Sequence, residues 1–409
     1  MICSHSIQNN SRPLFFRAPE PRGERLVIDP PCSHQRAWMR RALVLARRGE
    51  GRTSPNPMVG AVLVSNGRII GEGWHRKAGG PHAEIEAIEE ARRGGHSTAG
   101  SILVVTLEPC CTQGRTPPCT QAIVDAGIQA VVAATADPNP NHSGRGFQIL
   151  RAGGVRVETG VLSEASNQMN ESFNHWIVRR TPFVVLKLAM TLDGRLATAS
   201  GQSKWITGET ARREGMRLRK SADAILVGVN TLIADDPSLT IRTSSGRIVA
   251  GSSLRRFVLD TRGRTPLDAA VLNDDLARQT TVVLGLGTSR EIVRRLSEKV
   301  TVWEAPVMGG KIDLKSLVAR MGGDGITRLI VEGGGEVAAS FLGQGLVQRV
   351  AFFYAPKILG AAKALPGVGG AGASGASELL KLSQVRWRRA GEDLFLTARV
   401  EEPHVHWNS

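Results

Sequence analysis

The 409-residue sequence has few aromatic residues, few cysteines and no long apolar run. No stretch approaches the roughly 18 consecutive apolar residues that a membrane-spanning helix needs, so the sequence argues against a role in the bilayer. The five cysteines are too few, and odd in number, for a framework of disulfide bonds. A normal hydrophobic content of 41% predicts a soluble globular protein. Three of the five cysteines fall within ten residues, which indicates a metal or catalytic site in a reducing compartment, and we expect the cytoplasm.

The chain also lacks a secretory signal, since no continuous apolar core stands near its start. Residues 1–35 show neither helical nor strand periodicity, and we expect a flexible N-terminal extension there. A transit peptide is the alternative, because four arginines outnumber the acidic residues of this segment. They are Arg12, Arg17, Arg22 and Arg25.

Acidic residues are in the minority, and the formal net charge is +15. Nucleic-acid binding is one interpretation of such a balance. The basic residues are scattered, however, and aromatic residues are only 4% of the chain. A site for a small phosphorylated molecule accounts for the positive charge equally well, and we expect no nucleic-acid partner.

The length exceeds what one compact core usually accommodates, and the sequence indicates two α/β domains. In residues 36–178, helical and strand patterns alternate, which predicts a three-layer domain. A helix is expected over residues 37–51, and the dipeptide Asn66-Gly67 predicts a tight hairpin. The segment HWIVRRTP, residues 175–182, is the predicted linker.

A second α/β series occupies residues 179–409, without an internal repeat. Its strands include PFVVLKLAM, DAILVG, RFVLD and TRLIVE, and its helices include ARREGMRLRKSA. A formal G-x-G-x-x-G runs from Gly367 to Gly372 in a Gly/Ala-rich stretch. No strand precedes it and no acidic residue follows at the expected distance, so it is not a dinucleotide-binding fingerprint.

The segment PHAEIEAIEEA, residues 81–91, begins a helix with His82 and Glu84. Further along, Cys110 and Cys119 each follow a proline, and Cys119 begins another helix. One His and two Cys leave an open fourth position on Zn²⁺, which is the catalytic arrangement. Glu84 is then the proton carrier, and the set matches the H-x-E…P-C…C signature of zinc-dependent base deaminases.

Other interpretations of these residues remain. Alone, His82 and Glu84 would be a helix cap and a solvated acid. A structural zinc site would need a fourth ligand, and His75 is the nearby candidate. Cys111 points in another direction than Cys110 and is expected to take no part.

Longer motifs identify a family. The first half contains TSPNPMVGAVLV, GGPHAE, TLEPC, GRTPPC and DPNPNHSGRG. The second half contains LKLAMTLDGRLATASGQSKWIT, DAILVGVNTLIADDPSLTIR, VEGGGE and APKILG. In this order, from about Arg36 to the C-terminus, they resemble the bifunctional riboflavin-biosynthesis deaminase/reductase.

This resemblance implies a cytidine-deaminase-like domain followed by a dihydrofolate-reductase-like α/β domain. The first would hydrolytically deaminate 2,5-diamino-6-ribosylamino-4(3H)-pyrimidinone 5′-phosphate. The second would reduce the ribosylamino group to ribitylamino with NADPH. The implied cofactors are one Zn²⁺ per chain and NADPH, and the implied partner is a second copy of the chain in a homo-oligomer.

For the deaminase, the resemblance assigns zinc to His82, Cys110 and Cys119 and proton transfer to Glu84. Asn56, Asp137 and Asn139 would line the pocket. Thr112 departs from the family, which has His at that place, so the substrate contact made there is open. A folded but inactive deaminase is the corresponding alternative.

For the reductase, the resemblance assigns residues to cofactor and substrate. The NADPH contacts are Ala189, Trp205, Thr231, Asp235 and Thr261, with the loop Gly334, Gly335, Glu336, Val337, Ala338, Ala339 and Ser340. The substrate contacts are Ser203, Arg219, Leu239, Arg242 and Glu332. Two arginines suit a phosphate through bidentate hydrogen bonds, and a glycine-rich loop before a helix suits the cofactor phosphates. Lys187 and Asp235 are the candidate polar groups beside hydride transfer, with a strand-edge lysine and a helix cap as their alternatives.

Two competing functions are kept. One is a zinc-dependent nucleobase or tRNA deaminase with an unrelated second domain. The other is a zinc-stabilised binding module without activity.

Overall fold

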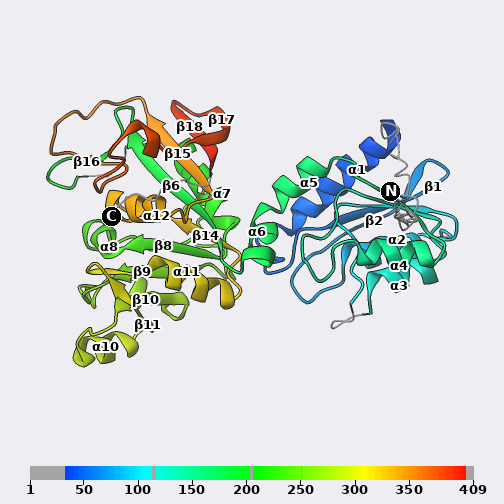
Figure 1. Cartoon of the computed structure of the whole chain (residues 1–409), viewed down its shortest axis with the longest axis horizontal. Coiled ribbons are helices and arrows are strands. Elements are labelled where there is room, and N and C mark those ends of the chain that lie inside the picture. The colour runs from blue at the N-terminus through cyan, green and yellow to red at the C-terminus, as the bar shows by residue number, and fades with distance from the viewer. Residues whose placement is uncertain (1–32, 113–116, 203–205, 250, 402–409) are drawn as a thin grey trace, which may run out of the picture.

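The computed structural model describes residues 33–112, 117–202, 206–249 and 251–401. These residues form two α/β units, each built on its own sheet, with helix α6 between them (Figure 1). Helix α1 (Ser33–Ala46) begins just inside the predicted N-terminal extension, and the rest of that extension lies outside the described residues. Within the described part of the chain, no helix is long and apolar enough to cross a membrane.

The first unit contains a five-stranded sheet in the order β2-β1-β3-β4-β5. The strands are β1 (Gly60–Ser65), β2 (Arg68–Trp74), β3 (Ile102–Val105), β4 (Ala130–Ala133) and β5 (Arg156–Thr159). Strand β1 is antiparallel to β2 and β3, whereas β3, β4 and β5 are parallel. The predicted hairpin joins β1 to β2, and both Asn66 and Gly67 have the positive φ that its turn requires.

Helices cover both faces of this sheet. They are α2 (Ala83–Arg93), α3 (Cys119–Asp125) and α4 (Arg145–Ala152) on one side, with α1 and α5 (Ser163–Met169) on the other. Alternate strand residues divide between the two cores, because successive side chains of a strand point to opposite faces. Leu63 packs with α2, for example, and Val62 and Val64 pack with α1. The predicted three-layer arrangement is confirmed.

The second unit contains a nine-stranded sheet in the order β11-β10-β9-β8-β14-β6-β15-β18-β17. The strands are β6 (Phe183–Thr191), β8 (Ala224–Gly228), β9 (Arg255–Asp260), β10 (Thr280–Gly285), β11 (Thr301–Ala305), β14 (Arg328–Val331), β15 (Arg349–Ala355), β17 (Leu382–Ala390) and β18 (Asp393–Val400). Neighbouring strands from β11 to β15 in this spatial order are parallel to each other. Beyond β15, strand β18 is antiparallel to β15, and the edge strand β17 is antiparallel to β18. Short pairs, β7 (Arg195–Ala197) with β16 (Leu365–Pro366) and β12 (Val307–Met308) with β13 (Lys311–Ile312), lie outside it.

Six α-helices are described in this unit, and buried apolar residues fill both faces of its sheet. The helices are α7 (Glu209–Lys220), α8 (Val229–Asp235), α9 (Ala270–Asn273), α10 (Arg290–Ser297), α11 (Leu314–Gly323) and α12 (Gly335–Gly343). Parallel strands leave their carboxyl ends at a common edge, where ligands bind in open α/β sheets. Helices α8 and α12 begin at that edge, directly after β8 and after the short segment following β14.

Helix α6 (Glu171–Arg179) joins the two units. The indole Nε1 of Trp176 donates a hydrogen bond to the carbonyl oxygen of Gly322 at 2.8 Å, and Arg349 pairs with Glu171 at 2.7 Å. The segment expected to be a linker is therefore helical up to Arg179, and the extended backbone of β6 begins four residues later.

Candidate active sites

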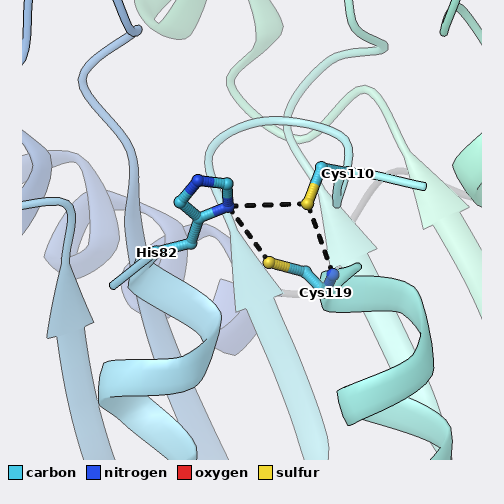
Figure 2. A group of neighbouring side chains, drawn as sticks. All are labelled: His82, Cys110 and Cys119. Carbon is cyan, nitrogen blue, oxygen red and sulfur yellow. Dashed lines mark hydrogen bonds between the residues drawn. The ribbon is translucent and has the colours of Figure 1, made fainter. Parts of the chain in front are cut away.

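The three predicted zinc ligands come together from separate elements (Figure 2). His82 is the N-cap of α2, Cys110 follows β3, and Cys119 is the first residue of α3 after the N-cap Pro118. Helices α2 and α3 pack on the same face of the sheet through Ala87 and Ile123, which brings their N-termini to one place.

The ligand atoms of His82, Cys110 and Cys119 all lie within 4.8 Å of one another. Nδ1 of His82 is 3.2 Å from Sγ of Cys119 and 3.5 Å from Sγ of Cys110. The backbone N–H of Cys119 donates to Sγ of Cys110 at 3.3 Å. One imidazole nitrogen and two sulfurs converging in this way suit a tetrahedral Zn²⁺ with one position left open.

The protonation of the two cysteines also suits a cation. A hydrogen bond from Cys119 is the main cause that lowers the pKa of Cys110 to about 4, with a further contribution from His82. The same hydrogen bond raises the pKa of Cys119. The directions of these shifts favour the thiolate at Cys110, and a metal ion held by both sulfurs would displace the remaining thiol proton.

Glu84 lies beside this cluster in the first turn of α2 and is only 3% exposed. Burial, reinforced by the negative charge of Cys110, raises its pKa to about 7. A carboxyl group with such a pKa can both accept and donate a proton near neutral pH, as a general acid–base catalyst must.

Two neighbouring candidates take no part in the cluster. His75 is buried, with Nδ1 2.9 Å from the carbonyl oxygen of Pro81 and Nε2 3.1 Å from the side-chain nitrogen of Asn56. Since both ring nitrogens are engaged, His75 does not complete a four-ligand structural site. Cys111 is likewise absent from the group of converging ligand atoms.

The segment from Asp137 to Phe147 packs against the start of the cysteine loop. The buried carboxylate of Glu108 accepts hydrogen bonds from four backbone N–H groups, at 2.8–3.3 Å. They belong to Asp137, Gly144, Gly146 and Phe147. The segment brings His142 to Thr112, with Nε2 3.4 Å from Oγ1. The motif DPNP indicated Asp137 and Asn139, but sequence reasoning missed Glu108 and His142, because their partners are 29 or more residues away.

In the second unit, a cavity of about 560 Å³ contains many of the predicted cofactor contacts. Thr231 of α8, Thr261 after β9, and Gly334, Gly335, Glu336, Val337 and Ser340 all line it. Ala338 and Ala339 are buried, so that only their backbone could face a ligand.

The glycines of this loop have different environments. A Cβ at Gly335 would lie 2.5 Å from the carbonyl oxygen of Pro366, whereas at Gly334 the nearest atom would be Oγ1 of Thr231, at 3.5 Å. Gly369 donates its N–H to the carbonyl oxygen of Gly335 at 2.9 Å. The Gly-rich segment that carries the formal G-x-G-x-x-G thus forms one wall of the cavity, although it is not a dinucleotide fingerprint.

Three basic residues line the same cavity and were not predicted: Arg262, Arg264 and Lys311. The turn that carries both arginines is anchored by buried Asp260, whose carboxylate accepts from the N–H and hydroxyl of Thr265, both at 2.7 Å. The sequence could have indicated the two arginines as ligand-binding candidates, because the basic run TRGR directly follows the strand RFVLD. Positive charge around a cavity of this kind favours a phosphorylated ligand.

Arg219, Glu332 and Lys187 form a separate cluster. Arg219 donates to Glu332 from Nε at 2.8 Å and from a terminal nitrogen at 3.0 Å, and Nζ of Lys187 is 3.3 Å from the same carboxylate. Burial alone would raise the pKa of Glu332, but the charges of Arg219 and Lys187 outweigh it and lower the pKa to about 2. The fork of Arg219 is therefore occupied by Glu332, not free for a phosphate.

The remaining predicted contacts are more scattered. Arg242 is exposed and donates to Ser238 at 3.0 Å. Leu239 is 2% exposed with a φ of 50°, an uncommon conformation that occurs at functional sites. Asp235 lines a second cavity, with Thr191 and Lys357, and Ala189 lies near the carboxyl end of β6. Ser203 and Trp205 lie outside the described residues.

Comparison with protein families matches both halves of the chain. Residues 32–135 match the family described as the cytidine and deoxycytidylate deaminase zinc-binding region. Residues 182–396 match the RibD C-terminal domain.

Relatives match this chain along most of its length. The riboflavin biosynthesis protein RibD of Aquifex aeolicus is 42% identical over 359 residues, which is 88% of this chain and 96% of that protein. RibD of Escherichia coli is 40% identical over 79% of this chain and 88% of its own.

Two solved structures superpose on most of this chain. Acinetobacter baumannii RibD superposes with a TM-score of 0.79 at 34% identity, covering 90% of this chain and 99% of that one. A diaminohydroxyphosphoribosylaminopyrimidine deaminase/5-amino-6-(5-phosphoribosylamino)uracil reductase from Thermotoga maritima gives 0.75 at 34% identity, with the same coverage.

Proposed function

Since this chain belongs to the RibD family of bifunctional deaminase/reductases of riboflavin biosynthesis, we propose that it deaminates 2,5-diamino-6-ribosylamino-4(3H)-pyrimidinone 5′-phosphate and then reduces the ribosyl side chain of the product. The observation that carries the first step is the convergence of His82, Cys110 and Cys119 beside buried Glu84. Residues 36–178 are the proposed deaminase domain and residues 179–409 the reductase domain.

In the deaminase, His82, Cys110 and Cys119 would hold a zinc ion, which would lower the pKa of water at its open position towards about 7. Glu84 takes the proton from the attacking water and delivers it to the departing amino group, so that ammonia leaves and the ring carbon gains an oxygen. The buried position of Glu84 keeps bulk water from competing for that proton. Asn56, Asp137 and Asn139 orient the pyrimidinone ring.

In the reductase, bound NADPH would supply the hydride that reduces the anomeric carbon of the ribosyl group. The ring C–O bond of the sugar breaks, and its oxygen takes up a proton. Lys187 is the proposed proton donor, because its ammonium group contacts Glu332 at only one atom and its side chain is 21% exposed. Glu332 and Arg219 position Lys187, and Arg242 is the better placed of the two predicted arginines to hold the substrate phosphate.

The cavity lined by Thr231, Thr261 and residues of the loop 334–340 would hold NADPH, and the start of α12 would favour its phosphates. The first N–H groups of α12 have no partner within the helix, because an α-helix bonds each N–H four residues back. Arg262, Arg264 and Lys311 line the same cavity and favour the additional phosphate that distinguishes NADPH from NADH.

We also infer a homo-oligomer acting in the cytoplasm. Strand β17 is an edge of the nine-stranded sheet, and Val385 and Trp387 on it are 46% and 58% exposed. An edge strand with exposed apolar side chains favours association with another chain. The cytoplasm supplies both NADPH and the reducing conditions that keep the zinc-binding cysteines as thiols.

Product analysis tests the function. The purified protein is incubated with the diaminopyrimidinone phosphate, with and without NADPH, and the products are identified by mass spectrometry. We expect the deaminated ribosylamino compound without NADPH and the ribitylamino compound with it. Parallel assays on cytidine, single-stranded DNA and tRNA test the competing function. Turnover there, with none of the pyrimidinone, would refute the proposal.

A further inference from the structure

Residues 108–112 and the segment 137–147 pack together beside the candidate zinc site. Glu108, two residues before Cys110, binds the segment through four backbone N–H groups. A Cβ at Gly146 would lie 2.4 Å from the carbonyl oxygen of Pro109, so the two stretches are in direct backbone contact. Side chains of the segment therefore hold defined positions relative to Cys110.

His142 is the titratable side chain through which this segment contacts Thr112. Its backbone is fixed on both sides, since its N–H donates to Asn139 at 2.9 Å and its carbonyl oxygen accepts from Arg145 at 2.8 Å. Nδ1 of the ring is 3.4 Å from a carboxylate oxygen of Asp137, and Nε2 is 3.4 Å from Oγ1 of Thr112. The carboxylate thus orients one edge of the ring, and the other edge faces Thr112.

A second basic group lies at the same place. Arg145 is exposed, and its backbone N–H donates to the carbonyl oxygen of His142 at 2.8 Å. A guanidinium group therefore extends from the same turn as the imidazole that faces Thr112. These two groups suit an anion more than the uncharged ring of a pyrimidinone.

We propose that His142, assisted by Arg145, binds the 5′-phosphate of the deaminase substrate. The inference rests on the proposed deaminase function. The ring carbon that reacts must lie next to the zinc ligands, and His142 is not among the converging ligand atoms. Its side chain is 25% exposed, so it meets the end of the substrate that points outward, which carries the phosphate. In this arrangement Nε2 of His142 donates to a phosphate oxygen in place of Thr112, while Nδ1 stays beside Asp137 and the side-chain nitrogen of Asn139, 3.4 Å from each.

Paired substrates test this assignment. Deamination of the phosphorylated pyrimidinone and of its dephosphorylated form is measured for wild type, His142→Ala and the size-preserving His142→Gln. For both variants we expect KM for the phosphorylated substrate to rise about tenfold, the effect of one charge-assisted hydrogen bond, with kcat changed less than about twofold. KM for the dephosphorylated form should not change. His96→Ala, at an exposed histidine of the same domain, is the matched control. Equal effects on both substrates, or none, would overturn the proposal.

Two further measurements separate this inference from the deaminase assignment. Oγ1 of Thr112 is close enough to Nε2 of His142 that Thr112→His could return an imidazole nitrogen to the same position. We expect Thr112→His to restore the phosphate preference of His142→Ala. Independently of turnover, the NMR signal of the His142 ring, assigned with His142→Gln, should shift on titration with ribose 5-phosphate and not with ribose. An unchanged signal contradicts phosphate binding even if deamination is confirmed, and a shift supports it even if wild type deaminates neither substrate.

Discussion

Nζ of Lys187 on β6 lies 3.3 Å from a carboxylate oxygen of Glu332, which follows β14. The parallel pairing of β6 with β14 brings them together, although 145 positions separate them in the sequence. Arg219 also binds Glu332, so the buried carboxylate of Glu332 lies between two cations.

This cluster predicts how stability depends on pH. The folded-state pKa of Glu332 is lowered to about 2. Its contribution is therefore fully present above the unfolded-state pKa of about 4.3 and is lost as pH falls towards about 2. Glu332→Gln should reduce the free energy of unfolding of the reductase domain at pH 7 by about 3 kcal/mol. The difference from wild type should shrink progressively below about pH 4. Urea unfolding at several pH values measures it, and a difference that stays constant with pH would show that Glu332 is not ionised by its neighbours.

Glu108 is expected to support the deaminase site through the backbone. Glu108→Ala leaves four N–H groups of the segment 137–147 without their acceptor. We expect a loss of roughly 3 kcal/mol in the stability of that domain, since unsatisfied buried donors are costly. Deamination should fall while reduction of the deaminated substrate persists. Glu158→Ala, at an exposed position of β5, is a suitable control. Wild-type stability and deamination in Glu108→Ala would show that the segment is held by other contacts.

Gly334 offers a test of where NADPH binds. Its φ of −65° is accessible to any residue, and a Cβ there meets only Oγ1 of Thr231, at an ordinary 3.5 Å. Gly334→Ala should therefore fold and bind NADPH nearly as wild type does. Gly334→Glu adds bulk and negative charge to the cavity wall, and we expect it to weaken NADPH binding more than about tenfold by repelling the cofactor phosphates. Titration followed by nicotinamide fluorescence gives both affinities. If Gly334→Glu binds NADPH as tightly as Gly334→Ala does, the cofactor lies elsewhere.

Adjacent cysteines allow a controlled test of the metal site. Cys110→Ser removes a sulfur of the converging group, whereas Cys111→Ser removes one outside it. Elemental analysis should find one zinc per chain in wild type and in Cys111→Ser, and a large loss in Cys110→Ser. Full zinc content in Cys110→Ser, or its loss in Cys111→Ser, would contradict the assignment of the ligands.

Local patterns predicted part of this molecule and long-range contacts decided the rest. Asn66-Gly67 specified a turn because both residues tolerate positive φ. His82 and Cys119 were predictable as neighbours because each lies at the start of a helix, and Cys110 because it follows a proline after a buried strand. The occupation of Arg219 by Glu332 could not be predicted, since it depends on how α7 packs beside β14. The same is true of the hydrogen bond from Gly369 to Gly335, which joins the Gly-rich stretch with the formal G-x-G-x-x-G to the candidate cofactor cavity.

Glu84→Gln tests whether one chain carries two independent active sites. The amide keeps the size of the buried side chain but cannot take up a proton, so zinc content and fold should be retained. Deamination of the diaminopyrimidinone phosphate should fall at least about a hundredfold, the lower range for loss of a general acid–base group. NADPH oxidation with the already deaminated substrate should continue at the wild-type rate, and Glu89→Gln, at an exposed position of the same helix, should retain both activities. Wild-type deamination by Glu84→Gln, with zinc bound, would contradict the role of Glu84 and with it the proposed chemistry of the first site.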